Sequence, residues 1–310
     1  MAGVCKNVLE AVGNTPLIEL CKMQRDTGAR VLAKFEAVNP GGSIKTRTAL
    51  GMVEAAERDG RLRPGSIIVE ATSGNQGIGL AMVAAAKGYR AIICMPDNMS
   101  EERKSLIRAY GAELRLVPAG RDIQEAIASA RRAAEEIAAD DPRVFLAGQF
   151  SNPANPWIHR TTTAREILEQ VDGPITAFVA GVGTGGSLTG IGEAIKERFP
   201  DAYVAAVEPE KAAILSGSRV MEHHVQQGIG DGLIPEVLNT AIYDDVIVVS
   251  DCDAVETAKR LAREEGLFVG VSSGSNVWAA LRVAAKLGNG KIVVTILPDT
   301  GERYLSCGLF

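Results

Sequence analysis

Short runs of β-branched and other apolar residues alternate along this chain with longer segments of helical pattern. The short runs predict strands over 66–71, 91–96, 113–118, 175–182, 203–209, 246–251, 267–272 and 291–298. The longer segments predict helices over 46–60, 75–89, 100–111, 123–139, 187–199, 254–266 and 275–288. Alternation of this kind builds parallel sheets with helices on both faces, so we predict an α/β fold.

The length of the chain predicts more than one hydrophobic core. At 310 residues the chain is somewhat long for a single core, and we therefore expect two subdomains. Paired proline and asparagine residues interrupt the alternation over 150–157, so this stretch is the best candidate for a seam between two halves.

Composition and charge narrow the class of protein. Hydrophobic residues make up 46% of the chain and charged residues 23%, which excludes a disordered chain. The net charge is −5, and no run of Lys and Arg is dense enough for a nucleic-acid or polybasic membrane surface. The N-terminal residues lack a secretory signal pattern, and no apolar run is long enough to span a bilayer. We expect a cytoplasmic protein without nucleic-acid or membrane partners.

The cysteines and histidines show no ligand or disulfide pattern. The five cysteines are scattered and form no Cys-x-x-Cys pair: Cys5, Cys21, Cys94, Cys252 and Cys307. The three histidines are not at ligand spacing with them. We therefore expect neither disulfides nor a metal site, and we place Cys94 in a buried strand.

Four predicted strand-to-helix turns are rich in glycine and in Ser, Thr or Asn. They cover residues 39–47, 70–79, 180–190 and 269–276. In open parallel sheets ligands bind at the carboxyl ends of the strands, where such turns lie. Helix N-termini hold anions through free N–H groups and the helix dipole. Four of these turns predict a crevice that receives more than one anionic group.

The glycine-rich loop at 181–187 has three readings. Gly181, Gly183 and Gly186 satisfy the G-x-G-x-x-G spacing, and the next predicted strand ends near Glu208, where a dinucleotide fold has its acidic ribose partner. A nicotinamide-dependent oxidoreductase is therefore one alternative. A phosphate cradle and a tight structural turn are the other two.

The remaining turns carry hydroxyls, amides and one lysine. Four polar residues, Thr72, Ser73, Asn75 and Gln76, exceed what a helix N-cap requires and could encircle a carboxylate. Lys45 alone would be read as a surface lysine. Together with a phosphate cradle and a carboxylate cradle, however, it suits a phosphorylated aldehyde cofactor such as pyridoxal phosphate. We expect the positive ends of nearby helices to lower the pKa of Lys45 and keep its amine reactive.

At these motifs the sequence resembles the cysteine synthase (O-acetylserine sulfhydrylase) family of fold-type II pyridoxal phosphate enzymes. The resemblance runs through the segments 12–20, 39–47, 70–81, 95–114, 149–159, 181–192, 207–210, 227–235, 270–275 and 297–310. It implies two subdomains, each a largely parallel twisted sheet flanked by helices, as in the β subunit of tryptophan synthase. The larger, cofactor-binding subdomain would comprise residues 1–42 and 149–310. Residues 43–148 would form a smaller, mobile subdomain that closes on the substrate.

The resemblance also implies roles for individual residues. Lys45 would bind pyridoxal 5'-phosphate covalently and act as the general base, while Asn75 and Ser272 would contact the ring oxygen and the ring nitrogen. The cofactor phosphate would lie against Gly183, Thr184, Gly185, Gly186 and Ser187. The substrate carboxylate would be received by Thr72, Ser73, Asn75, Gln76 and Gln149.

The implied activity is β-replacement on an O-activated serine, most simply O-acetylserine plus sulfide giving cysteine and acetate. The chain departs from the family at Thr46, where Asp is usual, and at Gln76, where Thr is usual. Gln76 leaves open the donor and the nucleophile, so synthesis of β-cyanoalanine or cystathionine and use of O-phosphoserine remain alternatives. A catalytically weak relative that binds a partner protein is a third possibility, against which the intact Lys45 argues. A homodimer and a serine acetyltransferase C-terminal peptide are the implied macromolecular partners.

Overall fold

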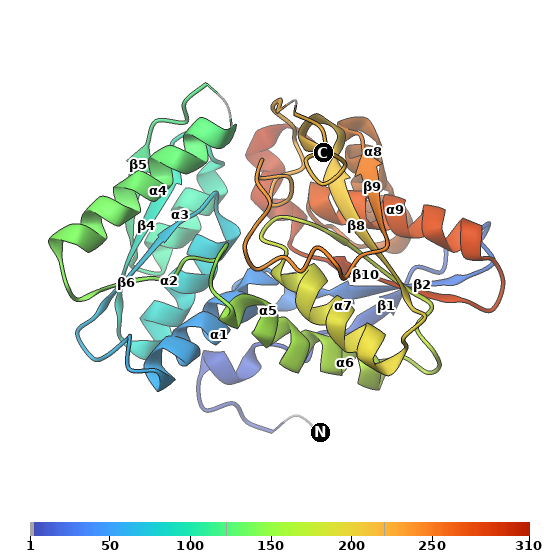
Figure 1. The fold of residues 1–310 in the computed structure, drawn as a ribbon, viewed down its shortest axis with the longest axis horizontal. Helices are drawn as coiled ribbons and strands as arrows, with labels where there is room; N and C mark the ends of the chain where they lie inside the picture. Colours follow the sequence, from blue (N-terminus) through green and yellow to red (C-terminus); the bar gives the residue numbers. More distant parts are fainter. Residues whose placement is uncertain (1–2, 122, 220) are drawn as a thin grey trace.

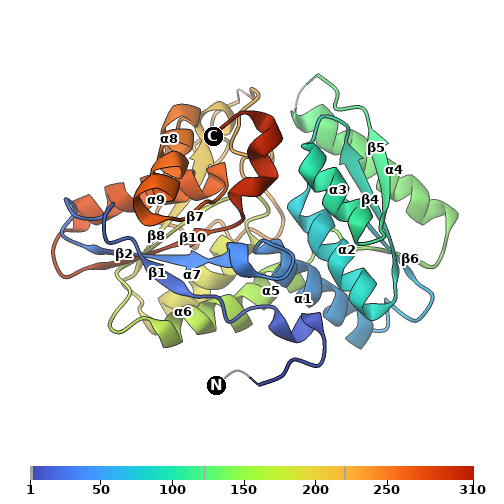
Figure 2. The same cartoon turned by 180° about the vertical axis from the view of Figure 1, so that it is seen from behind.

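The computed structural model describes residues 3–121, 123–219 and 221–310, which fold into two halves around two separate sheets. The halves lie side by side in Figure 1, and Figure 2 shows them from behind. One half holds a four-stranded sheet and the other a six-stranded sheet. The predicted α/β architecture with parallel sheets flanked by helices is confirmed.

The six-stranded sheet has the strand order β1-β2-β10-β7-β8-β9. Its strands are β1 (Leu17–Glu19), β2 (Arg30–Phe35), β7 (Ala177–Gly181), β8 (Tyr203–Pro209), β9 (Asp245–Val249) and β10 (Ile292–Leu297). Every neighbouring pair is parallel except β1 with β2. Chain segments from both ends of the sequence therefore meet in this sheet, because β2 pairs with β10.

The four-stranded sheet is entirely parallel and has the order β5-β4-β3-β6. Its strands are β3 (Ile67–Ala71), β4 (Arg90–Pro96), β5 (Glu113–Val117) and β6 (Val144–Leu146). Cys94 is fully buried in β4, as predicted. All five cysteines are free.

Helices cover both faces of each sheet. They are α1 (Lys45–Arg58), α2 (Asn75–Lys87), α3 (Glu101–Ala109), α4 (Ile123–Asp140), α5 (Ala154–Ile158), α6 (Ala164–Gln170), α7 (Gly186–Arg198), α8 (Asp251–Arg260) and α9 (Val271–Leu287). On the four-stranded sheet, α1, α2 and α3 bury one apolar face and α4 the other. On the six-stranded sheet, α8 and α9 cover one face while α6 and α7 cover the other.

Two predicted elements differ from the structure. The apolar run 267–272 is not a strand: Val269 makes only an isolated bridge to Thr300, and α9 already begins at Val271. Beyond this bridge the run pairs with no described strand of either sheet, and its last two residues form the first turn of α9. The predicted helix 254–266 is α8 followed by a π-helical turn over Leu261–Glu265.

A buried ionic cluster fixes the start of α1 to the six-stranded half. Arg47 lies in the first turn of α1 and is 2% exposed. Its Nε lies 2.8 Å from Glu36 Oε2, and its Nη1 lies 2.6 Å from Glu166 Oε1. Glu166, on α6, also accepts from Lys34 Nζ at 2.8 Å. Because each charge has a counter-charge, burial of the cluster is tolerated.

This cluster predicts a loss of stability in acid. Burial alone would raise the pKa of Glu166, but hydrogen bonds from Arg47, Lys34 and the backbone lower it to about 2 from 4.5. The resulting stabilisation, roughly 3 kcal/mol, is present above pH 4.5 and is lost as the pH falls toward 2. Urea unfolding measured between pH 7 and pH 3 should show this decline. A Glu166→Gln variant should lose less stability over the same range, and an equal slope for both proteins would contradict the assignment.

Candidate active site

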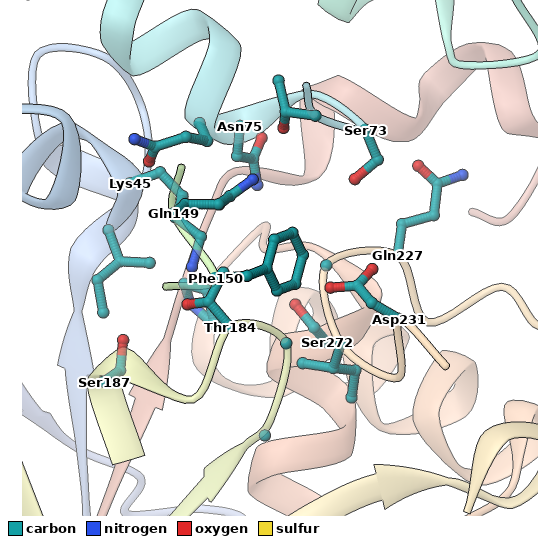
Figure 3. A pocket seen from close by; sticks show the side chains of 18 of the residues that line it. Lys45, Ser73, Asn75, Gln149, Phe150, Thr184, Ser187, Gln227, Asp231 and Ser272 are labelled. Atoms are coloured by element: carbon teal, nitrogen blue, oxygen red, sulfur yellow. The ribbon is translucent and has the colours of Figure 1, made fainter. Parts of the chain in front are cut away.

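A pocket between the two halves gathers residues from all four predicted turns (Figure 3). Among its lining residues are Lys45, Thr72, Ser73, Asn75, Gln76, Gln149, Gly183, Thr184, Gly185, Ser187 and Ser272. Of the residues proposed to hold pyridoxal phosphate or the substrate carboxylate, only Gly186 does not line it. The turns converge because the carboxyl ends of the strands in both sheets face the same crevice.

The glycine-rich loop joins β7 to α7 and forms one wall of the pocket. A Cβ at Gly183 would collide with the backbone carbonyl oxygen of Gly228. A Cβ at Gly186 would collide with the side chain of Asn155, so Gly186 lies against the protein behind the loop. Gly185 has a left-handed φ of +79° at the N-cap of α7. The glycines thus bring backbone N–H groups and the N-terminus of a helix to the pocket, as an anionic group requires.

Lys45 is the first residue of α1 and points into the pocket, as Figure 3 shows. Enclosure in the pocket lowers its pKa, and the charges of Asp231 and Asp299 partly oppose this effect. The expected direction was therefore right. Desolvation of the amine is the largest effect on this lysine, a cause that the sequence did not indicate.

Asn75 is held from both sides of its amide group. Its Nδ2 donates to Asp299 Oδ2 at 2.7 Å, and its Oδ1 accepts from Arg303. Tyr304 also donates its hydroxyl to Asp299 Oδ2, at 2.7 Å. Arg303 and Tyr304 belong to the C-terminal 3₁₀ helix (Gly301–Cys307). The residue that opens α2 is thereby oriented by the C-terminal segment, and one N–H of its amide remains for a ligand.

The loop before α2 carries the proposed carboxylate-binding residues. Thr72 Oγ1 accepts from the N–H of Gly74, while Ser73 is exposed to the pocket. Gln76 is 1% exposed, its Nε2 lies 3.7 Å from Met52 Sδ, and its Oε1 has no partner. An unpaired amide oxygen at the pocket wall is costly unless a ligand meets it. Gln76 therefore lines the pocket while its amide oxygen is buried and unpaired.

Ser272 lies in the first turn of α9 and is 3% exposed. It lines the pocket with a neutral hydroxyl. A carboxylate at this place would favour a protonated partner, whereas a hydroxyl can donate or accept without adding charge.

The pocket residues that were not identified from the sequence include Arg103, Phe150, Gln227 and Asp231. Arg103, on α3, donates to the Gln227 side chain and so links the two halves across the pocket. Burial raises the pKa of Asp231, although the charge of Lys45 lowers it. The sequence did contain a signal for Asp231, because this acidic residue stands between two glycines in the otherwise uncharged stretch 227–235.

The dinucleotide interpretation fails at Glu208. Its carboxylate accepts from Leu215 N at 2.8 Å and from Ser216 N and Oγ at 2.9 and 2.6 Å. It is 2% exposed and does not line the pocket, so no ribose can reach it. Glu208 therefore stabilises the segment that follows β8 by accepting these hydrogen bonds.

The described residues fit pyridoxal phosphate. They supply an amine of lowered pKa, a glycine-rich loop packed too closely against the protein to accept a Cβ, and a neutral hydroxyl beside one pocket. Within the same described part of the chain, no group of three His, Cys, Asp or Glu side chains could hold a metal ion. Nor is any helix of that part long and apolar enough to cross a membrane.

Comparison with known proteins gives consistent matches. Residues 8–299 match the family described as pyridoxal-phosphate dependent enzyme. A cysteine synthase of Staphylococcus aureus (strain Mu50 / ATCC 700699) is 48% identical over 305 residues, which cover 98% of this chain and 96% of that protein.

Solved structures agree with these matches. The structure of O-ureido-L-serine synthase is similar with a TM-score of 0.93 and 43% identity, covering 99% of this chain and 96% of that one. An O-acetylserine dependent cystathionine β-synthase from Helicobacter pylori has a TM-score of 0.94 and 34% identity, with both chains fully covered.

Proposed function

Because this chain belongs to the cysteine synthase family of pyridoxal-phosphate dependent enzymes, we propose that it catalyses β-replacement on an O-activated serine. The favoured reaction is O-acetylserine plus sulfide giving cysteine and acetate. The observation that carries the proposal is the convergence of Lys45, the glycine-rich loop and the 72–76 loop on one pocket. The names of the structural neighbours support two related reactions, which use other nucleophiles.

We assign roles by position in the pocket. Pyridoxal phosphate, when bound, supplies an aldehyde that condenses with amines and a ring that withdraws electrons from the amino-acid Cα. The N-terminus of α7 and the loop 183–187 hold its phosphate, and Ser272 and Asn75 contact its ring. Lys45 holds the aldehyde in the resting enzyme.

The protein residues carry the proton and position the substrate. Thr72, Ser73, Asn75, Gln76 and Gln149 bind the substrate carboxylate through hydroxyl and amide donors. Lys45, whose pKa is lowered by its enclosure, removes the Cα proton onto Nζ. The Cβ–O bond then breaks with release of acetate, hydrosulfide forms the Cβ–S bond in its place, and Lys45 Nζ returns the proton to Cα.

We further propose that the smaller subdomain moves, that the enzyme has macromolecular partners and that it acts in the cytoplasm. Residues 43–148 form the smaller subdomain, which closes on the substrate carboxylate and excludes water, while residues 1–42 and 149–310 hold the cofactor. The enzyme acts as a cytoplasmic homodimer. The C-terminal peptide of a serine acetyltransferase would compete for the same carboxylate-binding loop, because its terminal carboxylate offers the same group.

The function is tested on purified holoenzyme by product identification. Candidate donors are added in turn while the cofactor absorbance is recorded, and sulfide, cyanide or homocysteine is then added and the product mass is determined. Cysteine from O-acetylserine and sulfide, with the highest kcat/KM of the panel, is expected. If another β-substituted alanine formed faster, that reaction would be the assigned activity. If no donor reacted, the proposal of β-replacement would be refuted.

Gln76 should influence which donor or acceptor is used. Gln76 lines the pocket and its Oε1 is buried without a hydrogen-bond partner, and a polar group left without a partner costs about 1–3 kcal/mol, or roughly five- to a hundredfold in preference. We predict that Gln76→Thr changes the ratio of kcat/KM values between sulfide and other acceptors, or between O-acetylserine and other donors, at least fivefold. Ratios within about twofold of wild type across the panel would show that the side chain does not select substrates.

A further inference from the structure

Arg103 is a buried cation in the wall of the pocket that the proposed mechanism leaves unused. It lies on α3, lines the pocket and is 2% exposed. Among the described residues its guanidinium donates only to the Gln227 side chain and forms no ion pair with a carboxylate, and its Nε is buried without a partner. Because an arginine side chain does not lose its proton in proteins, the wall contains a buried positive charge that the described carboxylates do not pair.

The other contacts of Arg103 do not supply a counter-charge. Its Cζ lies 4.8 Å from the centre of the Tyr304 ring, and such a cation–π contact offsets only part of the cost of removing a guanidinium from water. Arg303, which precedes Tyr304, is 4% exposed and adds a second positive charge. Asp231 lines the same pocket without forming an ion pair with Arg103, and burial raises its pKa, which disfavours its charged form. Since buried charges in proteins are paired, we expect a bound anion to provide the missing charge.

Arg103 packs directly against the loop that is proposed to bind the substrate carboxylate. A Cβ at Gly74 would collide with Arg103 Cδ and would lie 2.5 Å from its Nε. Gly74 has a φ of +153°, which glycine adopts readily, and its N–H donates to Thr72 Oγ1 at 3.1 Å. Figure 3 shows Ser73, from this loop, and Gln227 on the side of the pocket away from Lys45. Arg103 therefore places its charge beside the backbone of the carboxylate-binding loop.

The loop itself supplies only neutral groups for a carboxylate. The proposed contacts are hydroxyls and amides, from Thr72, Ser73, Asn75, Gln76 and Gln149. The N-terminus of α2 adds a partial positive charge only. Neutral donors bind a carboxylate and an uncharged amide of the same shape, whereas a fixed positive charge stabilises the carboxylate alone. Discrimination between the two therefore requires a cation close to the loop.

We propose that Arg103 is the counter-charge that makes the loop 72–76 selective for a carboxylate over a neutral group. It acts through its charge, and its hydrogen bond to Gln227 and its packing on Gly74 and Tyr304 hold that charge in place. The inference rests on the proposed function in one respect, because the substrate must be an amino acid whose carboxylate occupies this loop.

The test compares L-serine with L-serinamide on the holoenzyme by their effect on cofactor absorbance. L-Serinamide replaces the carboxylate with a neutral amide of nearly the same shape. Arg103→Gln removes the charge and keeps an amide donor, and it should lower the preference for L-serine by about tenfold or more. The amines of the two probes differ in acidity, but this difference is the same for wild type and variant and cancels when their preferences are compared.

Three further variants separate the charge from the packing of the side chain. Arg103→Lys keeps a positive charge without the guanidinium and should retain the preference within about threefold. Gln227→Ala removes the hydrogen-bond partner but leaves the charge, so it should also stay within about threefold. Arg108→Gln is the matched control on the same helix, because Arg108 is exposed and does not line the pocket. Its preference should remain within about twofold of wild type.

Three results would overturn the proposal. They are an unchanged preference in a folded Arg103→Gln protein, an equal loss in Gln227→Ala, and a wild type that binds both probes equally well. If Arg103→Gln does not fold, Arg103→Lys decides, since a tenfold loss in that folded variant would contradict a role for the charge. Both probes are measured without an acceptor, so a failure of cysteine synthesis would leave these binding results intact and the two failures are distinguishable.

Discussion

Replacing Lys45 with alanine should lower kcat by about a thousandfold or more, which corresponds to roughly 4 kcal/mol of transition-state stabilisation. Lys45 lines the pocket at the start of α1, and burial lowers its pKa. Its amine can therefore act both as a nucleophile and as a base, which no other residue lining the pocket can do. Steady-state kinetics with O-acetylserine and sulfide provide the measurement. A variant that kept a tenth of the wild-type kcat would show that Lys45 is not the base.

A second lysine in the same half of the molecule serves as the control. Lys104 on α3 is 7% exposed and is paired with Glu101 at 2.6 Å, and it does not line the pocket. Lys104→Met should therefore retain kcat within a few-fold. Borohydride treatment of the wild-type holoenzyme, followed by peptide mass analysis, should place the pyridoxyl group on Lys45. A label on another lysine would contradict the assignment independently of the kinetics.

Replacing Arg47 with leucine should lower the free energy of unfolding by about 3–5 kcal/mol, since the change leaves Glu36 buried without its counter-charge. Glu36 is 0% exposed and accepts from Arg47 through both oxygens, each at 2.8 Å. Urea unfolding followed by circular dichroism gives the measurement. The double variant Arg47→Leu/Glu36→Gln should recover part of the loss, because the unpaired charge is then removed.

An exposed ion pair provides the comparison for Arg47. Arg143 lies 2.6 Å from Asp141 with 61% of its side chain exposed. Arg143→Leu should change the unfolding free energy by less than about 1 kcal/mol. If Arg47→Leu and Arg143→Leu lowered the free energy of unfolding equally, the buried position of the Arg47 ion pairs would make no difference to stability.

The sequence predicted those features that depend on local pattern. Seven strands of the two sheets, β3, β4, β5 and β7 to β10, and the four polar turns follow from hydrophobic periodicity and from glycine, which are properties of neighbouring residues. Their convergence on one pocket follows from the rule that parallel strands end at one edge. Lys45 could be selected because its turn resembled the other three.

Features that depend on distant partners could not be predicted in this way. The run 267–272 has strand composition but no strand beside it, which only the tertiary structure reveals. Desolvation by burial is the largest cause of the lowered pKa of Lys45, and burial in a pocket between the two halves cannot be read from the local sequence. Glu70, near the end of β3, adjoins a motif that the sequence singled out, yet its hydrogen-bond partner Gly148 lies more than 70 residues away.

The first turn of α1 contains both Lys45 and Arg47, so reactivity and fold stability share one short stretch of chain. Mutational tolerance should consequently be very uneven around the pocket. Substitutions within 43–47 would alter chemistry and folding together, and few such variants would survive selection. Gln76 and Asp231 line the same pocket without joining the ionic cluster of α1. A variant library seeking new nucleophiles should therefore randomise Gln76 and Asp231 and leave the lysine turn intact.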